Sequence, residues 1–327
     1  MSGNFNSPSS IQPLSLGNVV SAGLRLYRSH LKSYFFLALK VALWSLLPFL
    51  IFIPGGIILF SNSISGNNSP LAWLIIMVIG LGLYFYAFGR SLVNTTTISR
   101  LAFGELVNQP ETVSHAHKQV LPKLWSLVFT VITLSLGFLI ILICFVLFWS
   151  LIAFFGGLIL NAILNRNSLI MVLIIGLLNL LIFFAACAAF IWLSARLCLA
   201  VELLAIEDNL GLDTAISRSW DLSKGYGWRI VLILFVAFLI TIPIQIIVQL
   251  FIQIFSQPLI QYTILDAING STNAVILVSI VYLLILLIGF LMNALILPFW
   301  QAIKAVIYYD LRSRREGLGL QLRNREI

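Results

Sequence analysis

Long apolar runs, separated by shorter polar stretches, dominate the pattern along this 327-residue chain. A helix needs about 20 apolar residues to cross the ~30 Å hydrocarbon core of a bilayer, and the runs reach or exceed that length. We expect six membrane spans, at about 34–60, 71–98, 124–164, 168–194, 228–256 and 274–304. The pattern therefore predicts an all-α, polytopic helical membrane protein with six transmembrane helices.

The third run, 124–164, is too long for a single span. As one helix it would extend ~60 Å, about twice the hydrocarbon thickness. Two spans would need a turn, and the only glycines available for one are Gly137, Gly156 and Gly157. We expect one span followed by an outer apolar helix or a re-entrant piece at about 150–164, because a seventh span would reverse the orientation of everything downstream.

Composition and charge agree with a membrane location. Only 9% of the residues are charged, whereas a soluble domain is roughly 25% charged. Of the 19 Lys and Arg residues, only Arg166 falls in the loops on the side opposite the termini. Because Lys and Arg collect in cytoplasmic loops, we predict a bacterial cytoplasmic (inner) membrane protein with both termini in the cytoplasm. The net charge of +8 then favours membrane lipids with anionic headgroups as partners, and not nucleic acid.

An internal repeat is visible around the spans. A semi-polar stretch precedes each odd-numbered span, and each even-numbered span ends in a base that an acid follows five or six residues later. These base–acid motifs are Arg100/Glu105, Arg196/Glu202 and Lys304/Asp310. We predict three units of an interfacial helix plus two spans, at about 14–108, 109–208 and 209–311. A disordered tail (1–13) would precede these units, and a basic tail (312–327) would follow them.

The recurrence of the motif suggests a shared role for these six residues. They could fix the even-numbered helices at headgroup level or form salt bridges to neighbouring repeats. Alternatively, they could relay a proton or a substrate. The stretch before the fifth span adds four further candidate interface or coupling residues. They are Arg218 and Asp221, followed by Trp228 and Arg229 at the point where an aromatic anchor is expected.

Lys40 and Arg90 are polar candidates inside the predicted spans. Both can extend to the cytoplasmic interface. In the fifth span, glutamines recur at every fourth position from Gln245 to Gln257. An i+4 stripe drifts ~40° per step around a helix, and counting along the span places all but Gln245 at or beyond the far headgroups. We therefore expect an amphipathic outer extension instead of a permeation path, with only Gln245 hydrogen-bonding inside the core.

Two prolines fall at similar depths in the first and fifth predicted spans. They are Pro48 and Pro243. Proline removes a helix hydrogen bond and clashes with the preceding turn, so we expect similar kinks at both positions.

Three short stretches carry a family resemblance. They are LYRSHL (26–31), AISRSWDLSKGYGWRI (215–230) and VIYYDLRSRREGLGL (306–320). Together they resemble the membrane domain found fused to some bacterial glycerophosphodiester phosphodiesterases. The resemblance implies a polytopic helical membrane domain with no settled molecular activity. The hydrolytic chemistry of the fused enzymes belongs to a separate soluble domain, and no segment here is polar and long enough to hold one.

Residues that could support catalysis are sparse. His30, His115 and His117 are the only histidines, and no zinc, P-loop or nucleophile motif accompanies them. We therefore expect no catalytic activity, metal or cofactor. The leading hypothesis is an integral membrane scaffold or lipid-associated assembly factor, with a protein partner or as a homo-oligomer. The alternative is a transporter or channel, for example one for lipidic or amphipathic substrates.

Overall fold

The computed structural model describes residues 15–64, 70–164, 169–208, 210–269 and 271–317. Every regular element within these ranges is helical, and six helical segments are long and apolar enough to cross a membrane. The all-α class and the number of candidate spans are thus as predicted. The predicted N-terminal tail (1–13) and positions 318–327 of the basic tail lie outside the described residues.

The helices follow one another in a regular order along the chain. The first two predicted spans correspond to α2 (Leu31–Leu46) with α3 (Phe49–Ile64), and to α4 (Pro70–Leu106). The third and fourth correspond to α6 (Leu124–Leu164) and α7 (Leu169–Leu197), and the last two to α10 (Gly227–Ile268) and α11 (Thr272–Glu316). The shorter elements are α1 (Leu16–Ser29), α5 (Val113–Val120), the 3₁₀ turn η1 (Leu121–Lys123), α8 (Ala200–Ile206) and α9 (Leu212–Ser223).

The long apolar run at 124–164 forms one continuous helix of 41 residues, α6. The prediction of a separate outer helix or re-entrant piece at 150–164 is therefore wrong. The run contains no proline, and each isolated glycine lowers helix stability by only about 1 kcal/mol relative to alanine, so nothing in it stops the helix. A helix this much longer than the hydrocarbon core can be accommodated by tilting.

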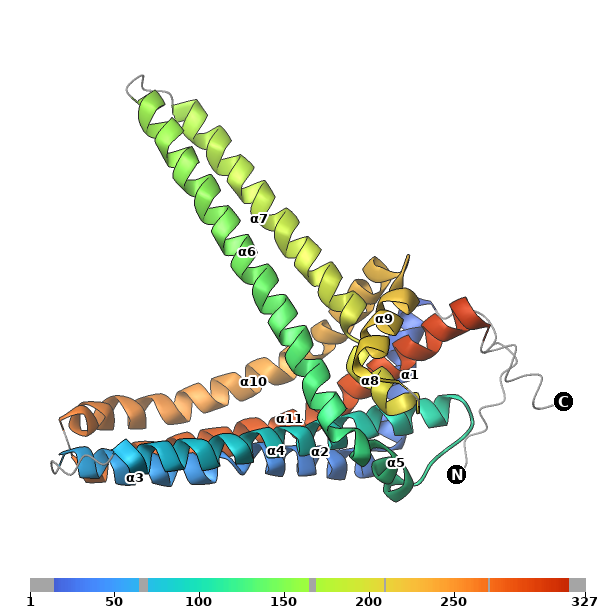
Figure 1. Cartoon of the computed structure of the whole chain (residues 1–327), viewed down its shortest axis with the longest axis horizontal. Coiled ribbons are helices and arrows are strands. Elements are labelled where there is room, and N and C mark those ends of the chain that lie inside the picture. The colour runs from blue at the N-terminus through green and yellow to red at the C-terminus, as the bar shows by residue number, and fades with distance from the viewer. Residues whose placement is uncertain (1–14, 65–69, 165–168, 209, 270, 318–327) are drawn as a thin grey trace.

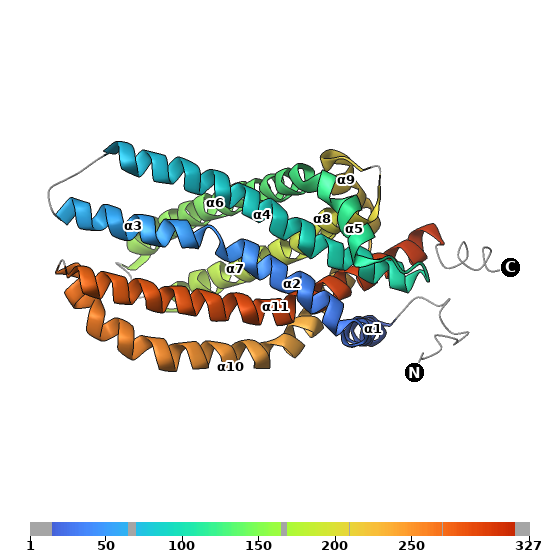
Figure 2. The ribbon, with the colours of Figure 1, turned by 90° about the horizontal axis from the view of Figure 1, so that it is seen from below.

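The two prolines behave differently. The first span is interrupted, since α2 ends at Leu46 and α3 begins at Phe49, with Pro48 between them. By contrast, α10 is continuous through Pro243, although Figure 2 shows that it is curved. The predicted similarity of the two positions is therefore only partial.

The long helices form two groups that diverge from a common junction (Figure 1). Four spans run lengthwise together (Figure 2): α11 packs on α10, α2 and α4, and α2 also packs on α4. We call α10, α11, α2–α3 and α4 the four-helix layer. The hairpin of α6 and α7, here the α6–α7 arm, rises away from that layer. At the junction α6 packs on α4 and α7 packs on α10, close to α5, α8 and α9.

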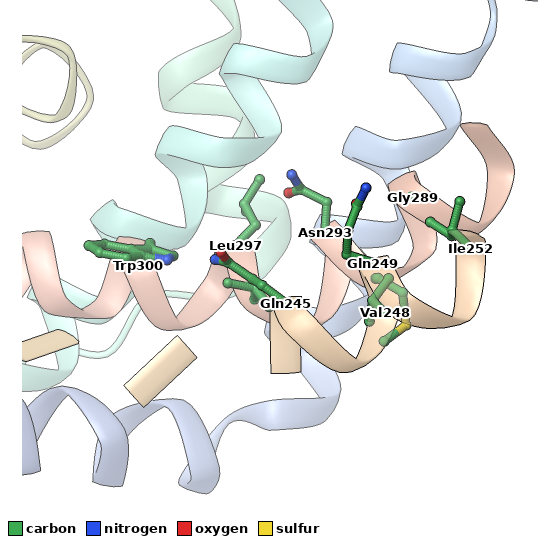
Figure 3. A pocket seen from close by; sticks show the side chains of 10 residues that line it. Gln245, Val248, Gln249, Ile252, Gly289, Asn293, Leu297 and Trp300 are labelled. Atoms are coloured by element: carbon green, nitrogen blue, oxygen red, sulfur yellow. The ribbon is translucent and has the colours of Figure 1, made fainter. Parts of the chain in front are cut away.

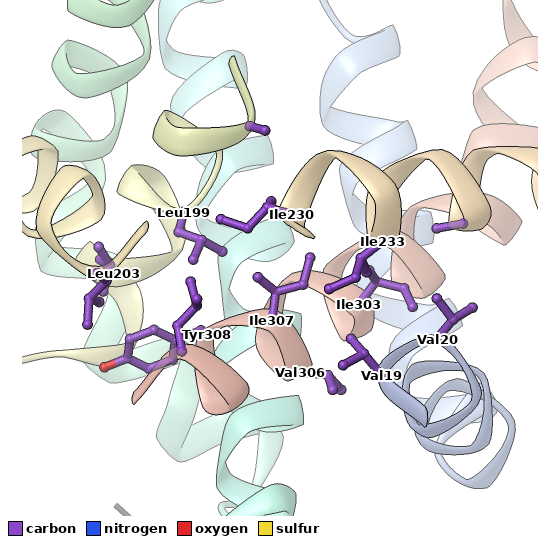
Figure 4. Close-up of a cluster of buried hydrophobic side chains, with 14 of the residues drawn as sticks. Val19, Val20, Leu199, Leu203, Ile230, Ile233, Ile303, Val306, Ile307 and Tyr308 are labelled. Atoms are coloured by element: carbon purple, nitrogen blue, oxygen red, sulfur yellow. The ribbon is translucent and has the colours of Figure 1, made fainter. Parts of the chain in front are cut away.

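Buried apolar side chains are concentrated at the junction. The largest cluster joins α1, α8, α10 and α11 (Figure 4), and includes Val19, Val20, Leu203, Ile230, Ile233, Ile303, Val306, Ile307 and Tyr308. In contrast, none of the residues in the most apolar windows of α6 and α7 is buried inside the molecule. Buried packing is therefore densest at the junction, whereas the α6–α7 arm presents its most apolar windows outward.

The first helix crosses this junction instead of running along the spans. Figure 2 shows α1 end-on beside the lengthwise spanning helices. Its buried residues are Val19, Val20, Gly23 and Leu26. A side chain at Gly23 would approach Ile303 of α11 closely, because an added Cβ would lie 2.5 Å from Ile303 Cδ1. The absence of a side chain at Gly23 is what lets α1 lie close to α11.

Candidate functional site

The first base–acid motif is at the junction, but its two members do not pair with each other. Arg100 of α4 donates through Nε to Glu111 Oε2 at 3.0 Å and through Nη1 to Asp208 Oδ1 at 2.8 Å. It also donates to the Ala205 carbonyl at 2.9 Å. Its side chain is only 9% exposed. Arg100 therefore joins α4 to the segments that precede α5 and follow α8.

Glu105, the acid of this motif, contacts His30 at the boundary of α1 and α2. The distance from His30 Nε2 to Glu105 Oε1 is 3.2 Å, and Ser29 Oγ lies 2.9 Å from His30 Nδ1. This serine–histidine–acid order is that of a hydrolase triad. However, the Ser29 hydroxyl also donates to the Leu26 carbonyl at 3.0 Å, as serines inside helices commonly do. We assign the group to the contact between α1, α2 and α4.

The second motif is also divided between different helices. The Arg196 guanidinium lies over the indole rings of Trp220 and Trp192, with centroid distances of 3.4 and 5.0 Å. It donates to the Trp220 carbonyl at 2.7 Å and to Ser223 Oγ at 3.2 Å. These contacts tie the end of α7 to α9. Its motif partner, Glu202, lies on α8 and takes no part in them.

Glu202 instead accepts a hydrogen bond from Lys304, the base of the third motif. The distance from Lys304 Nζ to Glu202 Oε1 is 2.7 Å, and the Glu202 side chain is 3% exposed. The second carboxylate oxygen of Glu202 is buried without a hydrogen-bond partner. This ion pair connects α8 to α11, so it joins the second predicted repeat to the third.

Asp310, the acid of the third motif, forms ion pairs with two arginines. Arg229 of α10 and Arg314 of α11 each place a nitrogen 3.0 Å from Asp310 Oδ2, and the Asp310 side chain is 2% exposed. Arg218 of α9 contacts Glu207 at 3.5 Å and also contacts Glu316.

Besides Arg196, two further predicted residues do not join the ion pairs. Asp221 has no side-chain hydrogen bond or ion pair among the residues that the structure describes. Trp228 is exposed at the start of α10.

These contacts form what we call the ion-pair layer. It comprises Arg100, Glu111, Lys123, Glu202, Glu207, Asp208, Arg218, Arg229, Lys304, Asp310, Arg314 and Glu316. Sequence reasoning missed Arg314 and Glu316 at the end of α11, and it also missed Glu111, Lys123, Glu207 and Asp208. For the last four the sequence did hold a signal. Their signal was position, since the three acids follow the ends of even-numbered spans and Lys123 precedes an odd-numbered one. The layer links helices laterally and does not line a path along them.

A polar groove lies between α10 and α11. It encloses about 480 Å³. Its polar lining comes from Gln245, Gln249, Asn293 and Trp300, and Figure 3 shows Gln249 and Asn293 next to each other and pointing to the same side. The remaining lining is mostly apolar and includes Val248, Ile252, Met292, Ile296 and Leu297. Gln253 and Gln257 are not part of it, so the glutamine stripe does not continue as a path.

The groove lies well along the spans from the ion-pair layer, at a depth that would fall inside the membrane. At 1.5 Å per residue, Gln245 is ~24 Å along α10 from Arg229, and Asn293 is ~16 Å along α11 from Lys304. An amide in hydrocarbon without a partner is unfavourable. Gln245 Nε2 donates a long hydrogen bond to Thr241 Oγ1 of the same helix, at 3.5 Å. Sequence reasoning missed Asn293, whose signal was an amide inside a predicted span.

The two predicted intramembrane bases, Lys40 and Arg90, lie on α2 and α4. The Arg90 guanidinium carbon is 5.2 Å from the centroid of a Trp44 ring, and Lys40 is exposed on α2. Within the described part of the chain, neither base has a carboxylate partner. In the same part of the chain, no group of three or more His, Cys, Asp or Glu side chains could hold a metal ion.

Comparison with known proteins adds no relative. No protein-family model, curated protein or solved structure matches this chain. The resemblance to the membrane domain of glycerophosphodiester phosphodiesterases therefore stays a prediction, and the function has to be argued from the geometry described above.

Proposed function

We propose that this protein is an integral membrane scaffold or lipid-associated assembly factor without catalytic activity of its own. It would lie in the bacterial cytoplasmic membrane with both termini in the cytoplasm. Its cytoplasmic face would hold anionic lipid headgroups, and its spans would hold a protein partner or a second copy of the chain. The orientation is supported by the ion-pair layer, whose cations gather at the end of the molecule where α1 and the last turns of α11 lie (Figure 1).

The observation that carries this proposal is the exposure of the α6–α7 arm. The arm stands apart from the four-helix layer (Figure 1), and its most apolar windows bury no residue inside the molecule. Substrate sites of many transporters are enclosed between packed repeats. An arm that diverges from the other spans instead offers two long apolar helices to lipid or to another membrane protein.

The ion-pair layer supports a fixed platform for that arm. Glu202 and Asp310 are almost completely buried, and each bonds to a base on another helix. Breaking a buried ion pair leaves an uncompensated charge, so such pairs resist separation of the helices that they join. A scaffold requires this kind of rigid junction, whereas a proton relay would require acids at mid-membrane.

The helix order also supports the threefold repeat that the sequence suggests. In this proposal the units are α1 to α4, α5 to α8, and α9 to α11. Each unit begins with a short helix and continues with two spans. The Lys304–Glu202 and Arg100–Asp208 contacts would then be bonds between units.

A test of the proposal compares the exposed arm with an equally exposed part of the layer. The arm variant replaces Leu139, Leu147, Leu177 and Leu181 with alanine, and the control replaces Ile247 and Ile254 of α10 with alanine. All six side chains are exposed. Protein purified in lipid nanodiscs is weighed by native mass spectrometry. We expect a stoichiometric partner or second copy on the wild type and the control, and its loss from the arm variant. A wild type that carries neither, and retains lipid only in bulk proportions, would refute the proposal.

A second candidate function is transport of a lipidic or amphipathic substrate. It is favoured by the polar groove, because Gln245, Gln249 and Asn293 expose amides at membrane depth. The test is lipid flux in proteoliposomes, comparing the wild type with the Gln245→Leu/Asn293→Leu variant. Flux that the variant abolishes would favour transport over the scaffold. We expect no flux above protein-free vesicles from either protein.

A further inference from the structure

Three basic residues lie on the helices that meet around α4, which packs on both α2 and α5. Arg90 is on α4, Lys40 on α2 and His117 on α5. Lys40 and Arg90 each adjoin the contact between α2 and α4, in which Ser91 Oγ donates a hydrogen bond to the Val41 carbonyl at 3.4 Å. Burial and the positive charges of Arg90 and Lys40 act on the His117 imidazole of α5. We call these three residues the basic cluster. It differs from the ion-pair layer, in which each base contacts an acid.

Contacts between the helices fix the depth of this cluster. Gly89, which precedes Arg90, lies against Leu124, the first residue of α6, since a Cβ at Gly89 would be 2.5 Å from Leu124 Cδ2. On the other side, Ser91 Oγ lies 3.2 Å from Ser45 Oγ of α2. The cluster is therefore level with the start of α6, where Trp125 is 54% exposed. An exposed tryptophan at the start of a span marks the membrane interface.

The Arg90 side chain is held in place but not neutralised. Its guanidinium lies over Trp44, and the Trp44 ring packs edge-on against Tyr86 with centroids 5.6 Å apart. Arg90 Nε is buried without a hydrogen-bond partner. A buried donor of a charged group that lacks a partner is costly, and an anion would satisfy it.

The surroundings distinguish a lipid from a soluble anion. Two large side chains beside the basic cluster are exposed. Leu43 precedes Trp44 in the chain, and the Tyr86 ring packs against the Trp44 ring. Lys40 is exposed on the same helix as Leu43. A ligand here would have its anionic group at the interface and its apolar part along α2 and α4. Basic pockets between spans on the cytoplasmic side are suited to such lipids.

From this geometry we infer that Lys40, Arg90 and His117 form a binding site for the phosphate of an anionic phospholipid, with Trp44 beneath the Arg90 guanidinium. Arginine presents a planar fork of donors that matches two phosphate oxygens, and lysine adds a point charge. The inference deepens the lipid association of the proposed function and rests on it, because it names the ligand class and its residues.

The test measures how much phosphatidic acid the protein retains in nanodiscs made mainly of phosphatidylcholine. Native mass spectrometry compares Lys40→Gln/Arg90→Gln with the control Lys32→Gln/Arg28→Gln, which removes equal charge from exposed positions on α2 and α1. We expect affinity for phosphatidic acid to fall roughly tenfold or more in the first variant and to stay unchanged in the control. Equal retention by both variants would overturn the site.

Two further measurements complete the experiment. The His117→Gln variant changes no residue of α2 or α4. If its affinity for phosphatidic acid falls to an intermediate value, the loss in the Arg90 variant cannot be explained by misfolding of those helices alone. An excess of inorganic phosphate should not displace the lipid; displacement would overturn a lipid as the occupant. If the Arg90 variant retains as much phosphatidic acid as the wild type, the proposed lipid site is wrong but the scaffold proposal stands. If the wild type carries neither bound lipid nor a partner, the proposed function itself is refuted.

Discussion

Lys304 of α11 donates a hydrogen bond to Glu202 of α8 over 2.7 Å, although the two residues are 102 positions apart. The carboxylate is 3% exposed and the lysine 26%. The pair therefore connects two separate segments of the chain through a nearly dry contact. Its two halves are not equivalent, because only the glutamate is fully enclosed.

The first prediction follows from this asymmetry. Lys304→Met leaves a buried carboxylate without a partner and should lower the free energy of unfolding by about 3–5 kcal/mol. Glu202→Gln should cost less, because the lysine it leaves is partly exposed. The double variant Lys304→Met/Glu202→Leu should recover most of the loss, since an apolar pair can replace an ion pair. Unfolding in detergent, followed by circular dichroism, measures all three. A Lys304→Met protein as stable as the exposed control Lys118→Met would contradict the prediction.

The second prediction concerns the close approach of α1 to α11. Gly23→Ala should destabilise the protein by about 1–3 kcal/mol, because the new methyl group would overlap Ile303. Gly17→Ala on the same helix has open space around it, so it should be neutral or stabilise by up to about 1 kcal/mol. Thermal unfolding of the two variants is the comparison.

A coupling measurement strengthens this test. The Ile303→Val substitution removes Cδ1, the atom nearest to the added methyl group. It should therefore cost less in the Gly23→Ala protein than in the wild type, which a double-mutant cycle reports as an interaction energy. Additive effects of the two substitutions would show that α1 does not pack on Ile303 as described.

The depth of each residue was readable from the sequence, but its lateral neighbours were not. Apolar length located six spans, and counting along them placed Lys304 and Glu202 at the same end of the molecule. Pairing them also needs the order of helices around the molecule, which hydrophobicity does not encode. For the same reason Arg100 was grouped with Glu105, five residues away, whereas its guanidinium reaches Glu111 and Asp208.

The continuous α6 and the groove lining are two further features that the sequence analysis did not predict. Bilayer thickness was used to divide the 124–164 run, but helix propensity and the absence of proline determine where a helix ends, so α6 continues. In the groove, counting along the span separated Gln245 from Gln249 by depth, whereas both line the same groove in the structure. That they meet Asn293 depends on the packing of α11, which their positions along α10 do not contain.

The third prediction tests whether Arg196 acts through its shape as well as its charge. Arg196→Lys keeps the charge but loses the stacking between Trp192 and Trp220 and the fork of donors to Ser223 and the Trp220 carbonyl. We expect a loss of about 1–3 kcal/mol in unfolding free energy. The same exchange at exposed Arg28 should change it by less than about 0.5 kcal/mol. Equal thermal midpoints for the two variants would show that charge alone matters at Arg196.

The fourth prediction is a pH dependence at the ion-pair layer. The hydrogen bond from Arg100 lowers the pKa of the Asp208 carboxyl. A carboxyl with a lowered pKa stabilises the folded protein above its unfolded pKa of about 3.9, and this contribution is lost as pH falls through the folded pKa. Because the Asp208 side chain is 63% exposed, the contribution should stay below about 1 kcal/mol and should shrink in high salt.

The measurement for Asp208 is the difference in unfolding free energy between the wild type and Asp208→Asn. This difference should be present at neutral pH and disappear in acid, once the wild-type carboxyl is itself protonated. Other acids of the layer titrate in the same range, so the difference between the two proteins is informative and the absolute stability is not. Asp221→Asn is the matched control, because Asp221 is exposed and has no ion pair in the described part of the chain. A difference for Asp208→Asn that persists unchanged in acid would mean that the substitution acts through packing and not through the charge paired with Arg100.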